Sequence, residues 1–315
     1  MGDDRHIIAG LHRQYGIRSS NIRLIYAGVN RIFEVKCGAQ AYIFKLFPKC
    51  SRAIESIQAE RLLVRHAAMC EVPCANVVIP LVRNEIAYTI EGEVYIGLLS
   101  NKIAGSQISY DNPDLDMLIA FGRALKALHS CKIPQLENLG QGPAVGLLER
   151  TQARGSRAPV ASKLRATLAA LLRSTLQNPL QLDGLLKCIS HGDVWPGNAL
   201  FNDQGAALID FEFVSVNYAQ CDLASYVWWL TGLPDKQLRL NAWYAFLSGY
   251  GAALIPRERN NFVGLIKWHE VRSLSFLIEN ALVGDDVANH LIGRAENLMA
   301  HAKSGMSAAE ILEAL

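Results

Sequence analysis

The chain has 315 residues, which is enough for one large domain or for two lobes with a buried core. Half of the residues are hydrophobic and the formal net charge is only +2, so the composition excludes intrinsic disorder and offers no strongly basic surface for nucleic acid. The start, MGDDRHIIAG, is no secretory signal and no apolar run approaches the roughly 18 residues of a membrane helix, so we expect a cytoplasmic protein with no membrane or nucleic-acid partner.

Residues 1–99 contain short β-branched and aromatic segments separated by turn signals, a pattern typical of an antiparallel sheet. One helix, at about 52–69, interrupts these segments. We interpret this part of the chain as an N-terminal lobe. The predicted strands cover residues 22–26, 32–36, 41–47, 77–82, 85–90 and 94–99.

After Gly105 the hydrophobic pattern becomes helical, which predicts a second, mainly helical lobe over residues 106–315. Residues 100–105 are polar with one glycine and are predicted to form a hinge between the lobes. The fold class is therefore α+β with two lobes. The predicted helices cover residues 114–130, 161–177, 180–188, 222–231, 236–250, 260–282 and 285–302.

The most informative segment is HGDVWPGNALFNDQGAALIDFEF, residues 191–213. Residues 202–205 are a strong turn signal between two short apolar segments, which predicts a hairpin in which residue 201 faces residue 206. The same register places Asn198 and Asp210 side by side at the open end of the hairpin.

Amide and carboxylate oxygens are hard ligands that suit Mg²⁺, so Asn198 and Asp210 form a candidate magnesium site. Asp193 lies five residues before Asn198, on a loop that contains Gly192 and Gly197. A carboxylate beside a metal site is a candidate general base.

A second group of charged residues lies in the N-terminal lobe. Lys45 shares one face of its predicted strand with Ile43 and Phe47, and Glu60 falls on the apolar face of the following helix. Because buried charges need partners, we predict a Lys45–Glu60 ion pair, which could also be purely structural. Upstream, the backbone amides of residues 27–31 could bind phosphate, although Gly28 alone is more typical of an ordinary turn.

Taken in order, these motifs resemble those of the aminoglycoside phosphotransferase and choline kinase superfamily, the small-molecule relatives of protein kinases that include type II homoserine kinases. Asp193 and Asn198 have the spacing of the protein-kinase catalytic loop H-R-D-L-x-x-x-N, with Gly192 in place of its arginine. Asp222 lies in a segment, CDLA, that resembles the family's Asp-Leu-Ala element. The resemblance implies a bilobal, protein-kinase-like fold.

The resemblance also implies how the N-terminal lobe binds ATP. Lys45 would contact the α- and β-phosphates and would be held by Glu60. The loop with Gly28 and Asn30 would cover the phosphates. The hinge backbone would hydrogen-bond the adenine, through Ser100, Asn101 and Lys102.

For the catalytic loop, the resemblance implies that Asp193 orients or deprotonates the acceptor hydroxyl. Asn198 and Asp210 would hold Mg²⁺. His191 would fix the conformation of the loop, and Asp222 would brace the loop.

Four further residues are candidates for contact with the acceptor, and each has a structural alternative. Trp195 and Trp268 could instead pack in the core. Glu212 could lie at the surface or brace the loop, and the helix face with Trp268, Arg272, Ser275 and Glu279 could border solvent. The candidates are Trp195, Glu212, Trp268 and Glu279.

We therefore predict an ATP- and Mg²⁺-dependent phosphotransferase with an alcohol group as acceptor. The acceptor would be a small, amine-bearing metabolite or an aminoglycoside-like natural product. A nucleotide-binding pseudokinase or regulatory module is the alternative. A protein kinase is disfavoured, because the chain reaches Asp222 only a dozen positions after Asp210, without Ala-Pro-Glu, and leaves no room for a peptide-docking segment. The sequence carries no signal for the oligomeric state.

Overall fold

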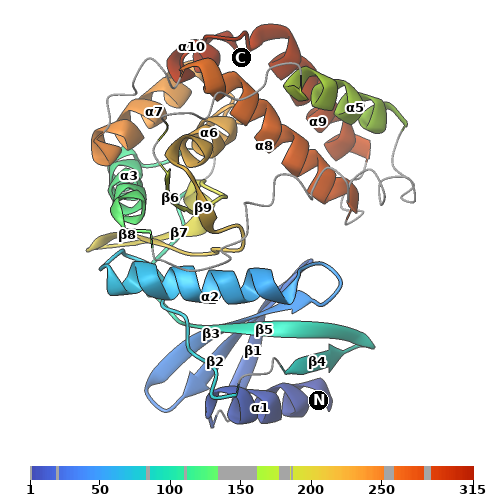
Figure 1. Ribbon diagram of the computed structural model, residues 1–315, viewed down its shortest axis with the longest axis vertical. Helices are drawn as coiled ribbons and strands as arrows, with labels where there is room; N and C mark the ends of the chain where they lie inside the picture. The colour runs from blue at the N-terminus through green and yellow to red at the C-terminus, as the bar shows by residue number, and fades with distance from the viewer. Residues whose placement is uncertain are drawn as a thin grey trace. The chain divides into compact units, whose positions relative to one another are not determined.

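The computed structural model describes residues 2–18, 21–82, 86–109, 112–133, 162–176, 185, 187–251, 259–279 and 285–315. The chain forms two compact units, Met1–Gly105 and Ser106–Leu315 (Figure 1). None of the helices in the described ranges is long and apolar enough to cross a membrane.

Unit 1 is built on a five-stranded antiparallel sheet with the strand order β1-β2-β3-β5-β4. The predicted strand at 77–82 is wrong, because this segment contacts the sheet only at its start, through an isolated bridge from Val77 to Ser100 and a bond from the Val78 N–H to the Leu99 carbonyl. The strands are β1 (Asn21–Ala27), β2 (Arg31–Cys37), β3 (Gln40–Pro48), β4 (Ala87–Ile90) and β5 (Glu93–Asn101).

The described part of unit 1 contains two helices, α1 (Gly2–Tyr15) and α2 (Ile54–Met69), where the sequence predicted one. Ile7, Leu11 and Tyr15 follow one another at i+4 spacing on α1 and are buried in one cluster with strand residues of the sheet. Complete burial of an Ile or Leu side chain contributes about 1.5–3 kcal/mol. This packing explains a helix whose N-terminal sequence is polar.

Unit 2 is mainly helical, as predicted, and three aromatic residues from three helices form its centre. Tyr226 stacks on Phe246 with ring centroids 4.1 Å apart, and Phe121 contacts both rings. The helices described are α3 (Leu115–Ser130), α5 (Ser162–Leu176), α6 (Ala219–Leu230), α7 (Lys236–Tyr250), α8 (Arg259–Glu279), α9 (Asp285–His301) and α10 (Ala308–Ala314).

Two short antiparallel ribbons complete unit 2. The first pairs β6 (Lys187–Ser190) with β9 (Ser215–Tyr218), so the predicted helix at 180–188 is wrong at its C-terminal end, and residues 180–184 lie outside the described part. The second pairs β7 (Ala199–Asn202) with β8 (Gly205–Leu208). Phe201 faces Ala206, which confirms the predicted hairpin register. This hairpin positions the candidate site.

Candidate active site

Residues 191–198 form the loop that the resemblance likens to the kinase catalytic loop, and we keep the name catalytic loop for these residues. Asn198 connects this loop to the hairpin. It ends the short 3-10 helix η1 (Pro196–Asn198) directly before β7, and its side chain is buried. Its Nδ2 donates to both the main-chain oxygen and Oδ2 of Asp193, each at 2.8 Å. Because an amide nitrogen carries two hydrogens, both are used, and Oδ1 is the atom that remains to accept a cation.

Asp210 follows the hairpin on the opposite strand. The Ile209 N–H donates to the Asn198 carbonyl at 2.9 Å, so Asn198 and Asp210 come from adjacent ends of the paired strands. Asp210 is exposed and has a φ of 60°, in the left-handed region that aspartate tolerates better than most residues. Two oxygen-bearing side chains thus share one end of the ribbon, as the register predicted.

His191 ties the loop to the segment after the hairpin. Its ring is buried, Nε2 donates to the Ile209 carbonyl at 2.9 Å, and the ring packs on Phe211 with a centroid distance of 4.6 Å. These contacts fix the loop that carries Asp193 against the segment that carries Asp210.

Gly192 explains why glycine occupies the arginine position of the protein-kinase motif. Its φ is 82°, where side chains are strained. A Cβ at this position would also lie 2.3 Å from the carbonyl oxygen of Phe213. The loop therefore excludes any side chain here.

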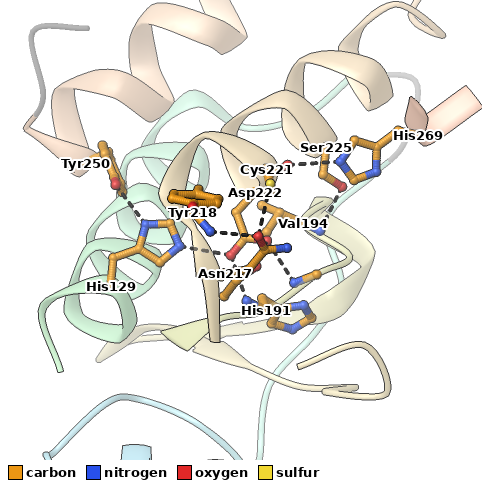
Figure 2. Close-up of polar contacts among 12 residues, drawn as sticks. His129, His191, Val194, Asn217, Tyr218, Cys221, Asp222, Ser225, Tyr250 and His269 are labelled. Atoms are coloured by element: carbon orange, nitrogen blue, oxygen red, sulfur yellow. Dashed lines mark hydrogen bonds and ion pairs between the residues drawn. The ribbon is translucent and has the colours of Figure 1, made fainter. Parts of the chain in front are cut away.

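Asp222, at the start of α6, accepts four hydrogen bonds from inside unit 2 (Figure 2). Its carboxylate is completely buried. The donors are Ser190 Oγ at 2.8 Å, the main-chain N–H of His191 at 2.7 Å, that of Gly192 at 2.8 Å, and His129 Nε2 at 2.9 Å. Burial alone would raise the pKa of Asp222, but the His129 and loop interactions outweigh it and lower that pKa. A charged carboxylate therefore holds the backbone of the loop.

Two of the residues around this network were missed by the sequence analysis. His129, in the last turn of α3, bonds Asp222 through one nitrogen and Tyr250 Oη through the other at 2.8 Å. Ser225, one turn after Asp222 on α6, accepts from the Val194 N–H at 3.0 Å (Figure 2). The only sequence signal for His129 was a polar residue on the buried face of a helix, which does not name its partner.

Arg272, on α8, makes the most unexpected contact with the loop. Its guanidinium donates to the Gly192 carbonyl and to Asp193 Oδ1, the latter at 2.5 Å, and its Cζ lies 4.6 Å from the ring centroid of Phe213. The interpretation that this helix face borders solvent is wrong for Arg272, whose side chain is 13% exposed. It is also wrong for Ser275, which is buried.

In unit 1, Lys45 and Glu60 lie on the predicted elements, but their surroundings include a residue that the sequence analysis missed. Lys45 Nζ lies 5.0 Å from the ring centroid of Phe47, on the same strand face. Arg52 covers this ring at 4.7 Å and donates to the buried Glu60 carboxylate at 2.5 Å. Arg52 is therefore an ion-pair partner of Glu60 that the sequence did not predict, while the Lys45–Glu60 pair stays a prediction.

The predicted phosphate loop is a tight turn. The Gly28 N–H donates to the Asn30 carbonyl at 3.0 Å. A Cβ at Gly28 would lie 2.4 Å from Tyr26 Oη, so a side chain here would displace the tyrosine ring. Because Tyr26 is exposed and can rotate away, this contact alone does not require glycine, and the phosphate-binding role of the turn stays a prediction.

The segment predicted to bind adenine already uses part of its backbone. The Asn101 N–H donates to Asn76 at 2.9 Å and the Lys102 N–H to Ala41 at 3.0 Å, while Ser100 pairs with β3. An adenine contact in this segment would therefore use other atoms.

The Lys102 side chain is engaged as well. Its Nζ lies 2.5 Å from Glu34, and Lys102 and Arg23 together lower the pKa of Glu34 to about 2. The cation is therefore paired with a carboxylate of the same unit.

The four acceptor candidates have different surroundings. Trp195 is partly buried and packs on Gly197, where a Cβ would lie 2.1 Å from its ring. Trp268 is partly buried and packs on an apolar cluster of α5, α8 and α9. Glu212 is partly exposed, and the side chain of Glu279 lies outside the described residues.

Comparison with known protein families decides the identity of the fold. Residues 26–255 match the model of the phosphotransferase enzyme family. The chain belongs to this family. The match covers more than half of the chain and includes the hairpin, the loop and Asp222. No curated protein sequence matches the chain significantly.

Solved structures with the same fold include several kinases. An amicoumacin kinase in complex with AMP-PNP, Ca²⁺ and Ami has a TM-score of 0.73 at 14% identity, covering 96% of this chain and 95% of that one. A microcompartment-associated aminopropanol kinase has a TM-score of 0.70 at 18% identity, covering 95% and 96%. A mutant of aminoglycoside phosphotransferase APH(4)-Ia, in a ternary complex with AMP-PNP and hygromycin B, has a TM-score of 0.66 at 15% identity, covering 93% and 98%.

These findings confirm three predictions: membership of the superfamily, the kinase-like α+β fold, and a small-molecule phosphotransferase with an alcohol group as acceptor. In this phosphotransferase, unit 2 brings Asp193, Asn198 and the Asp210 segment together on one loop and one ribbon. Asp222 and Arg272 hold that loop from two helices.

Proposed function

We propose that the protein is an ATP- and Mg²⁺-dependent kinase that transfers the γ-phosphoryl group to a hydroxyl of a small, amine-bearing molecule. One observation carries the proposal. The Asn198 amide orients the Asp193 carboxylate while its own Oδ1 remains for a cation, next to Asp210 on the paired strand. A proton acceptor and two hard oxygen donors are what phosphoryl transfer to an alcohol requires.

The donor set fits Mg²⁺. Asn198 Oδ1 and the Asp210 carboxylate would hold the ion, which takes its other ligands from phosphate and water. When bound, Mg²⁺ neutralises negative charge on the phosphates. The positive φ of Asp210 is a strained conformation of the kind found at functional sites.

Asp193 would accept the proton of the acceptor hydroxyl, because its carboxylate is held at both oxygens and is partly exposed. In unit 1, Lys45 would contact the α- and β-phosphates of ATP. The turn with Gly28 and Asn30 would cover these phosphates. Other atoms of the segment with Ser100, Asn101 and Lys102 would contact the adenine.

The acceptor class rests on the proteins of similar fold. Aminopropanol carries both a hydroxyl and an amine, and aminoglycosides are amino sugars with hydroxyls, so two of the similar structures belong to kinases named for amine-bearing alcohols. Trp195, Glu212, Trp268 and Glu279 are the proposed acceptor contacts. Of these, Trp195 has the strongest claim because it lies in the catalytic loop itself.

The test is an ADP-release assay with MgATP and a panel of amino alcohols, hydroxy amino acids and amino sugars. Each compound is paired with the analogue that lacks the amine. We expect turnover with at least one amine-bearing alcohol, less with its amine-free partner, and none when EDTA removes the metal. Binding of ATP without turnover on any hydroxyl compound would instead support a pseudokinase.

A further inference from the structure

Arg272 reaches the catalytic loop from a helix almost eighty positions later in the chain. Its Nη1 donates to the Gly192 carbonyl and its Nη2 to Asp193 Oδ1. Asn198 bonds the other carboxylate oxygen, Oδ2, at 2.8 Å. Both oxygens of the proposed base are therefore held, by donors from two different parts of the fold.

We propose that Arg272 is a positioning residue that sets the orientation of the Asp193 carboxylate for the acceptor hydroxyl. The proposal rests on the proposed function, in which Asp193 is the base. The planar guanidinium presents its N–H donors as a rigid fork, so one group can bond a main-chain oxygen and a carboxylate at the same time. This fork fixes the Asp193 side chain relative to its own backbone.

The guanidinium is itself held in place. The ring of Phe213, in the segment between β8 and β9, packs against the guanidinium, with its centroid 4.6 Å from Cζ. One turn earlier on α8, His269 Nε2 donates to the Cys221 carbonyl at 2.9 Å, next to Asp222 (Figure 2). Burial lowers the pKa of His269 to about 3, with Arg272 acting in the same direction, so the ring is neutral at pH 7. Helix α8 is thus fastened to α6 beside Arg272.

The two helices hold opposite sides of the same loop residue. Asp222, from α6, accepts from the Gly192 N–H, and Arg272, from α8, donates to the Gly192 carbonyl. The four donors to Asp222 are His129, Ser190 and the main-chain N–H groups of His191 and Gly192, whereas Arg272 bonds Oδ1 of the Asp193 side chain itself. We therefore infer that Asp222 holds the backbone of the loop and that Arg272 orients the Asp193 carboxylate.

Loss of this carboxylate orientation should lower the turnover rate rather than the affinity for ATP. A misplacement of about 1 Å at a reacting group can cost roughly 100-fold in rate. Arg272 contacts the base and its loop, and the predicted ATP contacts lie on other residues. We expect Arg272→Ala to lower kcat by about 10- to 100-fold and to leave KM for ATP within about threefold.

Arg294, on α9, offers a matched control. Its Cζ lies 4.3 Å from the Trp228 ring centroid, its Nη2 donates to the Trp228 carbonyl at 2.7 Å, and its Nε lies 3.1 Å from Glu270. This is the same combination of aromatic ring, carbonyl and carboxylate that surrounds Arg272. Its side chain is 16% exposed, close to the value for Arg272, and it does not contact the catalytic loop in the described residues.

The experiment measures kcat, both KM values and thermal unfolding for the wild type, Arg272→Ala, Arg272→Lys and Arg294→Ala, with rates referred to folded protein. Arg294→Ala should keep the wild-type kcat even if it unfolds earlier. Arg272→Lys should have a kcat between those of Arg272→Ala and the wild type, because an ammonium is a single point charge and cannot bridge both oxygens. Guanidinium ion added to Arg272→Ala should restore part of its turnover and should not raise that of Arg294→Ala.

Amide hydrogen exchange over residues 191–198 supplies a readout that needs no acceptor. Faster exchange in Arg272→Ala than in Arg294→Ala, by about tenfold, is expected if Arg272 orders the loop. Wild-type protein that turns over no acceptor would defeat the proposed function but would leave this comparison intact. Unchanged loop exchange, or a kcat that falls only in proportion to stability in both alanine variants, would overturn the role of Arg272.

Discussion

Asn198 bonds Asp193 twice, from one amide nitrogen to the main-chain oxygen and to the carboxylate. A single side chain therefore joins the proposed base to the proposed metal site. The geometry also sets the orientation of the amide, because both acceptors require nitrogen on that side and leave oxygen on the other. Substitutions at this position separate the two roles.

Asn198→Ala removes both the metal ligand and the two hydrogen bonds to Asp193. We expect the Mg²⁺ concentration for half-maximal activity to rise by about 10- to 100-fold, and kcat to fall. Asn198→Asp keeps an oxygen ligand but places a second carboxylate beside that of Asp193, so it should not restore kcat. A magnesium titration of ADP release measures both effects. Asn202→Ala, at the exposed far end of the same strand, is the control and should match the wild type.

Asp222→Asn should destabilise the protein, because the buried charge that accepts four donors is lost. Breaking a buried pair of this kind costs about 3–5 kcal/mol. The folded-state pKa of Asp222 lies below its ordinary value of 3.8, so its stabilisation is complete above pH about 3.8 and is lost as the pH falls towards the folded pKa. In urea unfolding, the difference in unfolding free energy between the wild type and Asp222→Asn should be constant at pH 5–8 and smaller below about pH 4. A difference in unfolding free energy that grows as the pH falls would contradict the assignment of Asp222 as a charged, stabilising carboxylate.

Gly192→Ala should distort the catalytic loop, because the new Cβ would meet the Phe213 carbonyl and the φ is positive. We expect a loss of about 1–3 kcal/mol in unfolding free energy together with reduced kcat. Gly293→Ala is the control. That glycine lies within α9 with open space around it, so alanine should leave stability unchanged or raise it by up to about 1 kcal/mol. Equal behaviour of the two variants would argue against a strained loop.

Lys45→Met tests the proposed phosphate contact in unit 1. Loss of a charged hydrogen-bond donor costs about 1.5–3 kcal/mol, so the affinity for ATP should fall by roughly 10- to 100-fold. Lys49→Met, four positions later at an exposed site, should leave it unchanged. Titration calorimetry with AMP-PNP and Mg²⁺ measures both. An unchanged affinity of Lys45→Met would remove Lys45 from the nucleotide site.

The hairpin could be predicted because its information is local. Residues 202–205 allow only a tight turn, and the apolar residues on either side then fix which partners face each other. The placement of Lys45 beside Phe47 followed from strand alternation in the same way. In both cases the two-residue alternation of a β-strand determines which side chains share a face.

Contacts between distant segments could not be predicted. His129 bonds Asp222 and Arg272 bonds Asp193, each from a helix far away in sequence, and no spacing rule links either pair. Lys187–Ser190 is a strand only because it pairs with β9, which overrides its local helical pattern. Helix α1 likewise depends on burial of its apolar side against the sheet.

The most direct test of the proposed mechanism compares wild-type protein with Asp193→Asn at equal occupancy by MgATP and an identified acceptor. The asparagine keeps the shape of the side chain but cannot accept the hydroxyl proton. We expect AMP-PNP to bind both proteins with similar affinity and the variant to transfer phosphate about 10²- to 10⁴-fold more slowly. Transfer at the wild-type rate by Asp193→Asn would contradict the assignment of Asp193 as the base.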